Sequence, residues 1–411
     1  MDVQDAPRLE TGTDEYEARL TVDRLQREVF DQPDPSASQA LLDELAAAEA
    51  HLRAVEAERQ KARPPDSSAG LILRAGQATS TERSAATTGL DARVQLNMAH
   101  VPTAFYHLLD ATKTPLLTAT VKATGRGADD TNIRRVRVSS WIEGYSAPAI
   151  STAEIQVNGD PFTCQHLPTL FPQAIAQLGE LTRATLRVQI EDLKGDLELQ
   201  QTQPIWMLAR TCAPLGVLDP TTGEWQDLAP YLGAFVTPNA PSLMTFLREA
   251  ARCHPSGRLV GYQGERANVE VQVKALFKAL QAADITYVNS TITFNPQQGF
   301  SSQRVRLPRE SLADKQANCI DGTVLFASLL EGISLSPAIV LVPGHAFVAW
   351  QTWRADEDEW RYLETTMLGT SSFEAAAQAA EATARRFSEA EQLRRLPLRQ
   401  LRTVDGITPM E

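Results

Sequence analysis

Apolar and polar residues alternate at every second position along several stretches in the middle of the chain. The clearest stretch is 117–123, where apolar residues alternate with Thr118, Thr120 and Lys122, and shorter ones lie at 135–138 and 186–191. A period of two is typical of strands that bury one face and expose the other. These stretches therefore predict a run of strands around a common core between residues 95 and 212.

A run of such strands predicts a β-sandwich, and we expect it to be immunoglobulin-like. Trp141 and Trp206 are expected to fill its core rather than to bind a ligand. The stretch carries no evident chemistry. We expect the sandwich to position a protein partner or a catalytic domain.

Near the start of the chain the apolar spacing changes to that of a helix. Positions separated alternately by four and three residues form a seam of about two heptads, namely Leu41, Leu45, Ala48, Leu52 and Val55. We expect a helix that packs on its own chain, with a short coiled coil or a partner-docking helix as the alternative. Pro64 and Pro65 end the helix, and the stretch 66–94, rich in Ser, Thr, Gly and Ala, is expected to be a linker.

Between residues 315 and 366, a helix and three strands are predicted in succession. The apolar run 320–330 is long enough for a buried helix, and 337–342 and 345–353 predict two strands joined by a Pro-Gly turn. A third strand is expected at 360–364, antiparallel to the second. In an antiparallel pair, the residue numbers of opposite positions have a constant sum. If His345 stands opposite Glu364, this sum is 709 and Phe347 faces Tyr362.

Three residues with thiol-enzyme chemistry lie at the junctions of these elements, in the order Cys319, His345 and Glu364. A thiol attacks as its thiolate, which a helix N-terminus and a neighbouring imidazolium stabilise. The His transfers the proton to the leaving group, and a carboxylate orients the His. We therefore expect Cys319 as nucleophile, His345 as general base and acid, and Glu364 as the residue that orients His345. Asp321, in the first helical turn, is expected to bind backbone N–H groups and to act structurally.

This stretch resembles the transglutaminase-like superfamily of papain-like thiol enzymes. The likeness rests on Cys319 at a helix start, on His345 within Gly-His-Ala at a strand start, and on an acidic residue after the next strand. It covers roughly residues 228–411, with the motif within 300–370. Glu364 stands where the family usually has Asp, and Asn318 stands where Gly is common before the Cys. The resemblance implies peptidases, cross-linking acyltransferases or amidases.

The oxyanion of such a reaction needs hydrogen-bond donors. The backbone N–H of Cys319 is expected to supply one, and Gln303 and Asn318 are candidates for a second. Cysteine and histidine at Cys164–His166 and Cys253–His254 have no companion pair at metal-ligand spacing, so we expect no metal site and no cofactor.

Composition narrows the classes of partner. The 411 residues carry a formal net charge of −12, which disfavours nonspecific binding to nucleic acid or anionic membranes. An apolar run long enough to span a membrane does not occur in the sequence. The acidic start lacks an apolar stretch, so we expect no secretion signal there. Four widely spaced cysteines do not form a disulfide framework. We expect a cytoplasmic protein, and the high use of Ala and Arg suggests a bacterial source.

Taken together, the sequence predicts an α+β multidomain chain. We expect a helical N-terminal segment (1–65), a linker (66–94), an immunoglobulin-like sandwich (95–212) and a transglutaminase-like catalytic domain (213–411). The expected function is a cysteine protease acting on a peptide or amide bond through a thioester on Cys319, with a protein or peptide as substrate. One alternative is a non-enzymatic interaction module with a vestigial catalytic fold, which would bind a protein through the sandwich or the N-terminal helix. The other is an amide acyltransferase.

Overall fold

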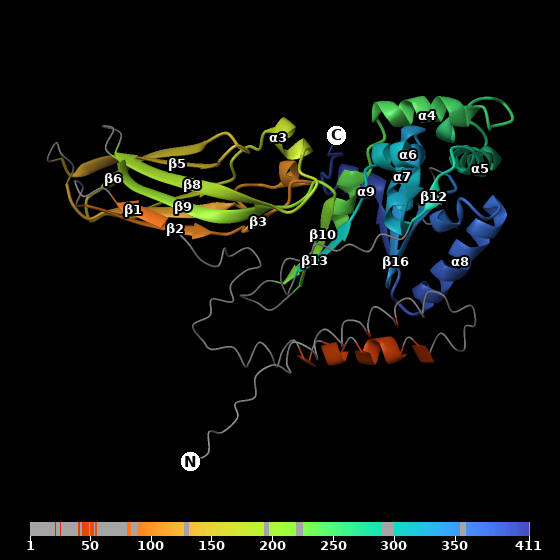
Figure 1. The fold of residues 1–411 in the computed structure, drawn as a ribbon, viewed down its shortest axis with the longest axis horizontal. Helices are drawn as coiled ribbons and strands as arrows, with labels where there is room; N and C mark the ends of the chain where they lie inside the picture. Colours follow the sequence, from red (N-terminus) through yellow and green to blue (C-terminus); the bar gives the residue numbers. More distant parts are fainter. Residues whose placement is uncertain are drawn as a thin grey trace, which may run out of the picture. The chain divides into compact units, whose positions relative to one another are not determined.

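The computed structural model describes residues 80–83, 89–126, 131–192, 197–218, 225–288, 300–353 and 359–410, together with parts of 21–55. The chain is a mixed α+β protein with several sheets and helices (Figure 1). It divides into two compact units. The helical unit comprises Met1–Ser68, Pro241–Asn289 and Ser311–Leu398, and the sandwich unit comprises Ala69–Ala240, Ser290–Glu310 and Arg399–Glu411.

The sandwich unit contains two large sheets. One has the order β1-β9-β8-β5-β6, with β3 beside β9, and the other has the order β2-β4-β7. Their strands are β1 (Ser80–Arg83), β2 (Leu90–Leu96), β3 (His100–Val101), β4 (Leu117–Ala123), β5 (Ile133–Ile142), β6 (Ala149–Gln156), β7 (Phe162–His166), β8 (Thr182–Asp192) and β9 (Leu197–Met207). A 3₁₀ helix η1 (Tyr106–Leu108) and a short helix α3 (Pro172–Ala176) lie in the connections.

The three alternating stretches of the sequence form β4, β5 and β8, which confirms the strand predictions. Inward side chains from both sheets meet in one apolar core, as shown by the buried Val121 of β4, Val138 of β5 and Val188 of β8. The apolar positions alternate in the sequence because every second side chain of these strands enters this core. The expected linker, 66–94, was too long, since residues 80–83 form β1, which pairs with β9, and residues 90–94 belong to β2, which pairs with β4.

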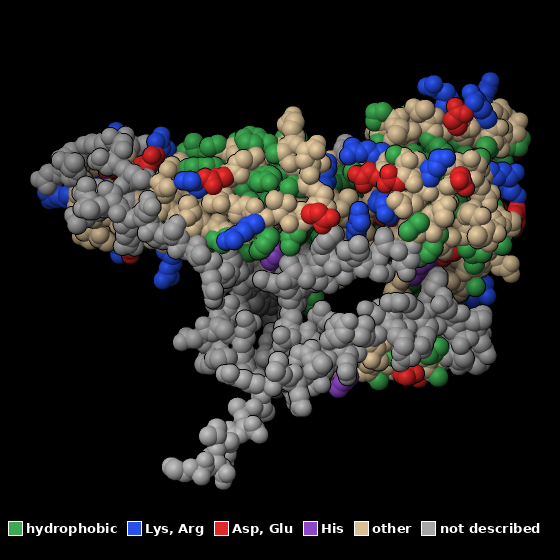
Figure 2. All heavy atoms as spheres, viewed as in Figure 1, with side chains coloured by type: hydrophobic (Ala, Val, Ile, Leu, Met, Phe, Trp, Pro, Cys, Tyr) green, Lys and Arg blue, Asp and Glu red, His purple; other side chains and the backbone are tan. Residues whose placement is uncertain are grey.

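The two tryptophans expected in this core lie on the outside of the six-stranded sheet. On β5 the inward side chains are Val136, Val138 and Ile142, so Trp141 points outward and is only half-buried. Trp206 of β9 is 37% exposed. The prediction that both fill the core was wrong, because both positions are out of phase with the inward side chains of their strands. Ile133 and Ile150 of the same sheet are also exposed, and hydrophobic side chains are visible on the surface of the protein in Figure 2.

A smaller sheet completes the sandwich unit. It has the order β11-β10-β13, and its strands are β10 (Cys212–Leu218), β11 (Trp225–Asp227) and β13 (Phe300–Arg304). The 3₁₀ helix η2 (Ala229–Phe235) and helix α9 (Leu398–Thr403) pack near each other, since a side chain added at Gly233 would meet Leu401. Helix α6 (Pro308–Asp314) contains the boundary between the units.

The helical unit is built on a four-stranded antiparallel sheet of order β17-β16-β15-β18. Its strands are β15 (Pro337–Val342), β16 (His345–Gln351), β17 (Trp360–Leu363) and β18 (Arg394–Pro397). Around it lie α4 (Pro241–Ala251), α5 (Ala267–Ala282), α7 (Cys319–Gly332), α8 (Phe373–Glu389) and the 3₁₀ helices η3 (Gly261–Gln263) and η4 (Thr365–Met367). A parallel pair, β12 (Thr286–Tyr287) and β14 (Gln316–Ala317), precedes α7.

Helix α7 is the central helix of this unit. Residues 320–330 are all buried, as the continuous apolar run predicted, and the helix contacts β15 and β16 as well as α4 and α5. A helix that is apolar on all sides must be covered on all sides. Helix α7 is therefore enclosed between the sheet that carries His345 and the helices α4 and α5.

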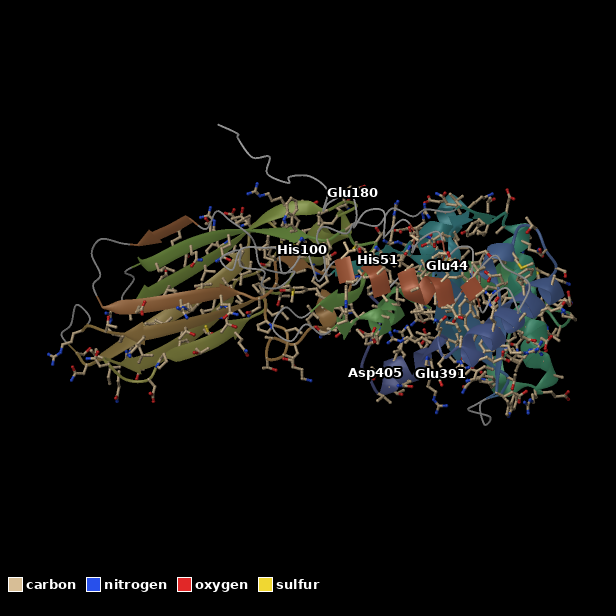
Figure 3. The ribbon with its side chains drawn as sticks, turned by 90° about the horizontal axis from the view of Figure 1, so that it is seen from below. Glu44, His51, His100, Glu180, Glu391 and Asp405 are labelled. Atoms are coloured by element: carbon tan, nitrogen blue, oxygen red, sulfur yellow. The ribbon has the colours of Figure 1, made fainter. Side chains whose placement is uncertain are left out.

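The N-terminal seam packs on its own chain, as expected. Leu45 is 1% exposed and belongs to an apolar cluster with Val340 of β15, Phe347 of β16 and Phe387 of α8. Glu44 and His51, in contrast, are exposed (Figure 3). The seam thus closes one face of the sheet. Much of the segment, including Pro64 and Pro65, lies outside the described residues, and a partner-docking role stays a prediction.

Candidate functional site

A capping box fixes the start of α7, where Cys319 is the first helical residue. The side-chain oxygen of Asn318 accepts a hydrogen bond from the Asp321 N–H at 2.8 Å, and the Asp321 carboxylate accepts from the Asn318 N–H at 3.2 Å. This reciprocal pair satisfies two backbone donors and fixes the direction of the first turn. Cys319 itself is half-buried. The expected structural role of Asp321 agrees with these contacts.

His345 is the first residue of β16 and follows the turn at Pro343 and Gly344. Gly344 has φ of 72°, a conformation that glycine adopts without strain. His345 and Glu364 are both buried, and His345 Nε2 lies 2.7 Å from Glu364 Oε2. Cys319 is also hydrogen-bonded to the imidazole. Because Nε2 is engaged by Glu364, we infer that the contact with the thiol is made by Nδ1.

The hairpin that carries His345 and Glu364 is antiparallel, as expected, but its register differs by two residues. Trp360 pairs with Gln351 and Tyr362 with Ala349, so that paired positions sum to 711. The predicted sum of 709 was wrong. Residues 354–355 lack the Gly or Asn of a tight hairpin turn, and the last pair of the ladder, Gln351 with Trp360, leaves residues 352–359 between the strands.

The shifted register explains how a glutamate reaches the imidazole. Extending the ladder by one pair places Glu364 opposite Phe347, which makes Glu364 a diagonal neighbour of His345. Diagonal neighbours are about 7–8 Å apart at the backbone, within reach of long side chains. The additional methylene of Glu, compared with Asp, suits this longer span. The rings of Phe347 and Tyr362 still contact each other, with centroids 6.0 Å apart.

Burial and charge act in opposite directions on the imidazole. Burial alone lowers the pKa of His345, but the hydrogen bonds and charges of Cys319 and Glu364 outweigh it and raise the pKa to about 9. Burial likewise raises the pKa of Glu364, while His345 and Thr366 lower it further than burial raises it, so the net shift is downward. His345 and Glu364 therefore form an ion pair at neutral pH.

The second carboxylate oxygen of Glu364 is held by Thr366, which the sequence analysis missed. Glu364 Oε1 accepts from the Thr366 backbone N–H at 3.0 Å and from the Thr366 hydroxyl at 2.7 Å. Glu364 thereby caps η4. An acidic residue followed by two threonines at a strand end is a capping signal that could have indicated this contact.

Gly322 and Thr365 bring the thiol helix and the acidic residue together, and both were also missed. A Cβ on Gly322 would lie 2.8 Å from Thr365 Oγ1 and 3.1 Å from Thr365 Cβ. The Thr365 hydroxyl lies 3.5 Å from the Cys319 carbonyl oxygen, which also accepts from Thr323 at 2.7 Å. Glycine at 322 thus allows η4 to approach the first turn of α7. Only the tertiary structure reveals this contact.

The two oxyanion candidates lie in different units. Asn318 precedes Cys319 directly, and its side-chain oxygen caps α7. Gln303 lies on β13 in the sandwich unit, pairs with Ala213, and donates from Nε2 to the Arg304 carbonyl at 3.2 Å. An oxyanion role for either residue stays a prediction.

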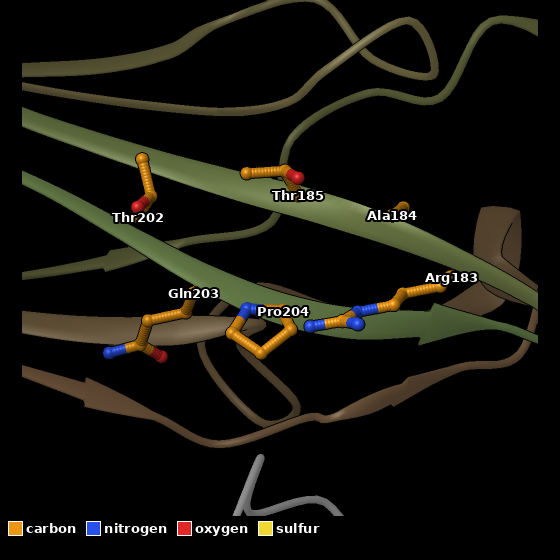
Figure 4. Close-up of a pocket in the computed structure, with 6 residues that line it drawn as sticks. All are labelled: Arg183, Ala184, Thr185, Thr202, Gln203 and Pro204. Atoms are coloured by element: carbon orange, nitrogen blue, oxygen red, sulfur yellow. The ribbon is translucent and has the colours of Figure 1, made fainter. Parts of the chain in front are cut away.

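A shallow hollow of about 360 Å³ lies on β8 and β9 of the sandwich (Figure 4). Its lining consists of Arg183, Ala184, Thr185, Thr202, Gln203 and Pro204. It belongs to a different unit from Cys319 and His345. Its lining contains no His, Cys, Asp or Glu, and so no nucleophile paired with a base.

The part of the chain that the structure describes contains neither a metal-binding cluster nor a membrane-spanning helix. That part holds no group of three or more His, Cys, Asp or Glu side chains able to bind a metal ion. Within the same residues, no helix has both the length and the apolar character needed to cross a bilayer. Comparisons with protein-family models, with curated proteins and with solved structures find no match to this chain.

Proposed function

We propose that this chain is a thiol enzyme that cleaves a peptide or amide bond through a thioester on Cys319. The observation that carries the proposal is a buried imidazole held between a thiol and a carboxylate, with His345 Nε2 2.7 Å from Glu364 Oε2. The thiol begins a helix and is half-buried, as a nucleophile must be reachable. A structural histidine needs neither a thiol nor a charged partner.

In the starting state the proton of Cys319 is held by His345, which leaves a thiolate beside an imidazolium. The imidazole stays protonated at neutral pH because its pKa is raised to about 9. The thiolate then attacks the carbonyl carbon, the new C–S bond forms, and the π electrons move to the oxygen. The backbone N–H of Cys319, at the positive end of α7, stabilises this oxyanion.

The intermediate then collapses to the thioester. His345 gives its proton to the amide nitrogen, the C–N bond breaks, and the amine leaves. Neutral His345 next takes a proton from water, whose oxygen attacks the thioester. The C–S bond then breaks, the carboxylic acid departs, and the thiolate of Cys319 is restored beside protonated His345. Glu364 remains ionised throughout, because its pKa is lowered by His345 and Thr366 in spite of burial.

The finer fold assignments are part of the proposal. A thiol at the start of α7 packed on a sheet that carries His345 supports a transglutaminase-like domain. In the other unit, the sheet orders β2-β4-β7 and β9-β8-β5-β6 support an immunoglobulin-like sandwich. The division of the first strand also supports it, since β2 pairs with β4 in one sheet while β3 runs parallel to β9 in the other.

A protein or peptide is the proposed substrate, in a reducing cytoplasm where the four free cysteines stay reduced. The test is to incubate cellular proteins with the wild type and with Cys319→Ala and to identify new chain termini by mass spectrometry. We expect new termini with the wild type alone. Cys212→Ala, at a buried cysteine of the sandwich unit, is the matched control and should behave as the wild type.

Different products separate the alternatives. New isopeptide cross-links instead of new termini would identify an acyltransferase. The third outcome is that neither product forms and that Cys319 is alkylated no faster than the half-buried Cys253. It would indicate a non-enzymatic interaction protein with a vestigial site.

A further inference from the structure

The two oxygens of the Glu364 carboxylate have separate partners. Oε2 binds His345 at 2.7 Å, and Oε1 accepts two hydrogen bonds from Thr366, at 3.0 Å from the N–H and 2.7 Å from the hydroxyl. Glu364 is 4% exposed, so water competes little for either oxygen. Two donors on one oxygen restrict rotation of the carboxylate about its last torsion, which is otherwise broad. The direction of Oε2 is therefore set by the contacts of Oε1.

The two contacts from Thr366 differ in what they require of the sequence. The backbone N–H bond caps η4 and would form with any residue except proline at this position. The hydroxyl bond needs Thr or Ser. It is a bond to an ionised acceptor, and such bonds are stronger than bonds between neutral groups.

We propose that Thr366 is a positioning residue of the thiol site, whose hydroxyl fixes the Glu364 carboxylate so that Oε2 holds His345 Nε2 and Nδ1 faces Cys319. This inference rests on the proposed function, because the orientation affects a reaction only if Cys319 reacts. The titratable groups that act on His345 are Glu364 and Cys319. Loss of the hydroxyl raises the pKa of Glu364, whose lowering depends in part on this bond.

The test compares three variants by two measurements. Thr366→Val removes the hydroxyl with little change in shape, and Thr366→Ser retains it. Thr370→Val is the matched control, since Thr370 lies just beyond η4, is exposed, and bonds only weakly to Ser371 at 3.5 Å. The measurements are the NMR titration of the His345 ring and the rate of Cys319 alkylation by iodoacetamide as a function of pH.

We expect Thr366→Val to titrate His345 at lower pH than the wild type and to slow alkylation at neutral pH about tenfold, the loss of one hydrogen bond to a charged group. In Thr366→Ser the pKa of His345 and the alkylation rate of Cys319 should be those of the wild type. Thr370→Val should change neither quantity. A purely structural threonine would alter stability without moving the titration.

Wild-type behaviour of Thr366→Val in both measurements would overturn the inference, and so would a serine variant as impaired as the valine variant. If valine prevents folding, Thr366→Ala takes its place, and unfolding of both would assign Thr366 a structural role instead. The proposed function fails separately, through slow alkylation of wild-type Cys319. In that event the NMR titration of His345 still decides whether Thr366 orients Glu364 toward His345.

Discussion

Each unit of this protein buries a histidine with both ring nitrogens hydrogen-bonded, and the two histidines have different partners. In the sandwich, His166 on β7 contacts two serine hydroxyls, Ser140 at 2.8 Å and Ser151 at 3.0 Å. In the helical unit, His345 contacts a carboxylate and a thiol. Both imidazoles are well packed and satisfied.

The two histidines differ in the charge of their partners. Burial lowers the pKa of His166, and its neutral hydroxyl partners do not reverse the shift. Burial also acts to lower the pKa of His345, but Glu364 and Cys319 raise it to about 9. A buried and fully bonded histidine is thus no sign of a site by itself. The charged partner and the half-buried thiol are what separate a candidate catalytic histidine from a structural one.

Replacing each histidine is the strongest test of this comparison. We expect His345→Gln to lower amide cleavage by about 10²- to 10⁴-fold, the usual contribution of general acid–base catalysis. His166→Gln should leave the rate unchanged and lower the free energy of unfolding by about 1–3 kcal/mol, because the buried Ser140 and the half-buried Ser151 lose their partner. Rates and urea denaturation measure both effects. An equal loss of activity in both variants would refute the distinction.

The two histidines should also give opposite pH dependences of stability. A raised folded pKa means that the folded state holds the proton of His345 more tightly, so its contribution is full below about pH 6.5 and is lost as pH rises through about 9. The folded pKa of His166 is lowered, so its contribution is full above about pH 6.5 and is lost as pH falls through its folded pKa.

These contributions appear as differences between the wild type and each glutamine variant in urea denaturation. For His345→Gln the difference should shrink at alkaline pH by an amount on the order of a few kcal/mol. For His166→Gln it should shrink at acidic pH. Parallel pH profiles for the two variants would show that Glu364 does not set the charge of His345.

A smaller effect is expected where the thiol helix meets the acidic turn. In Gly322→Ala the new methyl group would lie 2.8 Å from Thr365 Oγ1 and 3.1 Å from its Cβ, and Thr365 is buried next to Glu364. We expect a loss of about 1–2 kcal/mol in stability, since overpacking outweighs the gain in helix propensity. Alkylation of Cys319 should also slow.

The matched control for Gly322 is Gly179 of the sandwich unit, where an added methyl group meets nothing within 4 Å. Gly179→Ala should change stability by no more than about 0.5 kcal/mol and alkylation not at all. A Gly322→Ala protein as stable and as reactive as the control would show that η4 can move away from α7 without cost.

Local pattern predicted the elements well and their mutual placement less well. Period-two alternation identified β4 and β8, and chain order with junction positions identified Cys319 and His345. The register of the hairpin could not be predicted, because 352–359 contains no tight-turn signal. The outward position of Trp141 could have been predicted, since it is out of phase with Val136 and Val138.

Of the two contacts that complete the site, one is local and the other depends on tertiary structure. Thr366 contacts Glu364 two residues away, and an acidic residue followed by two threonines is a capping signal in the sequence. Gly322 matters only because Thr365 approaches α7. Neither the alternation nor the helical spacing of the sequence contains that proximity. Sequence patterns therefore find side chains with distinctive chemistry more readily than the residues that orient them.

The smallest predicted effect compares the starts of two helices in the helical unit. Asp321 accepts from the Asn318 N–H at the start of α7, and Ser372 accepts from the Ala375 N–H at the start of α8. We expect Asp321→Asn and Ser372→Ala each to lower the free energy of unfolding by about 1 kcal/mol, the usual value of a helix cap. Neither should lower amide cleavage more than about twofold, since an anion at 321 opposes a thiolate at 319 and its removal is no loss to the thiol. Urea denaturation and cleavage rates of the two variants measure this pair. An Asp321→Asn protein with unchanged stability and no activity would move Asp321 from the helix cap into the reaction.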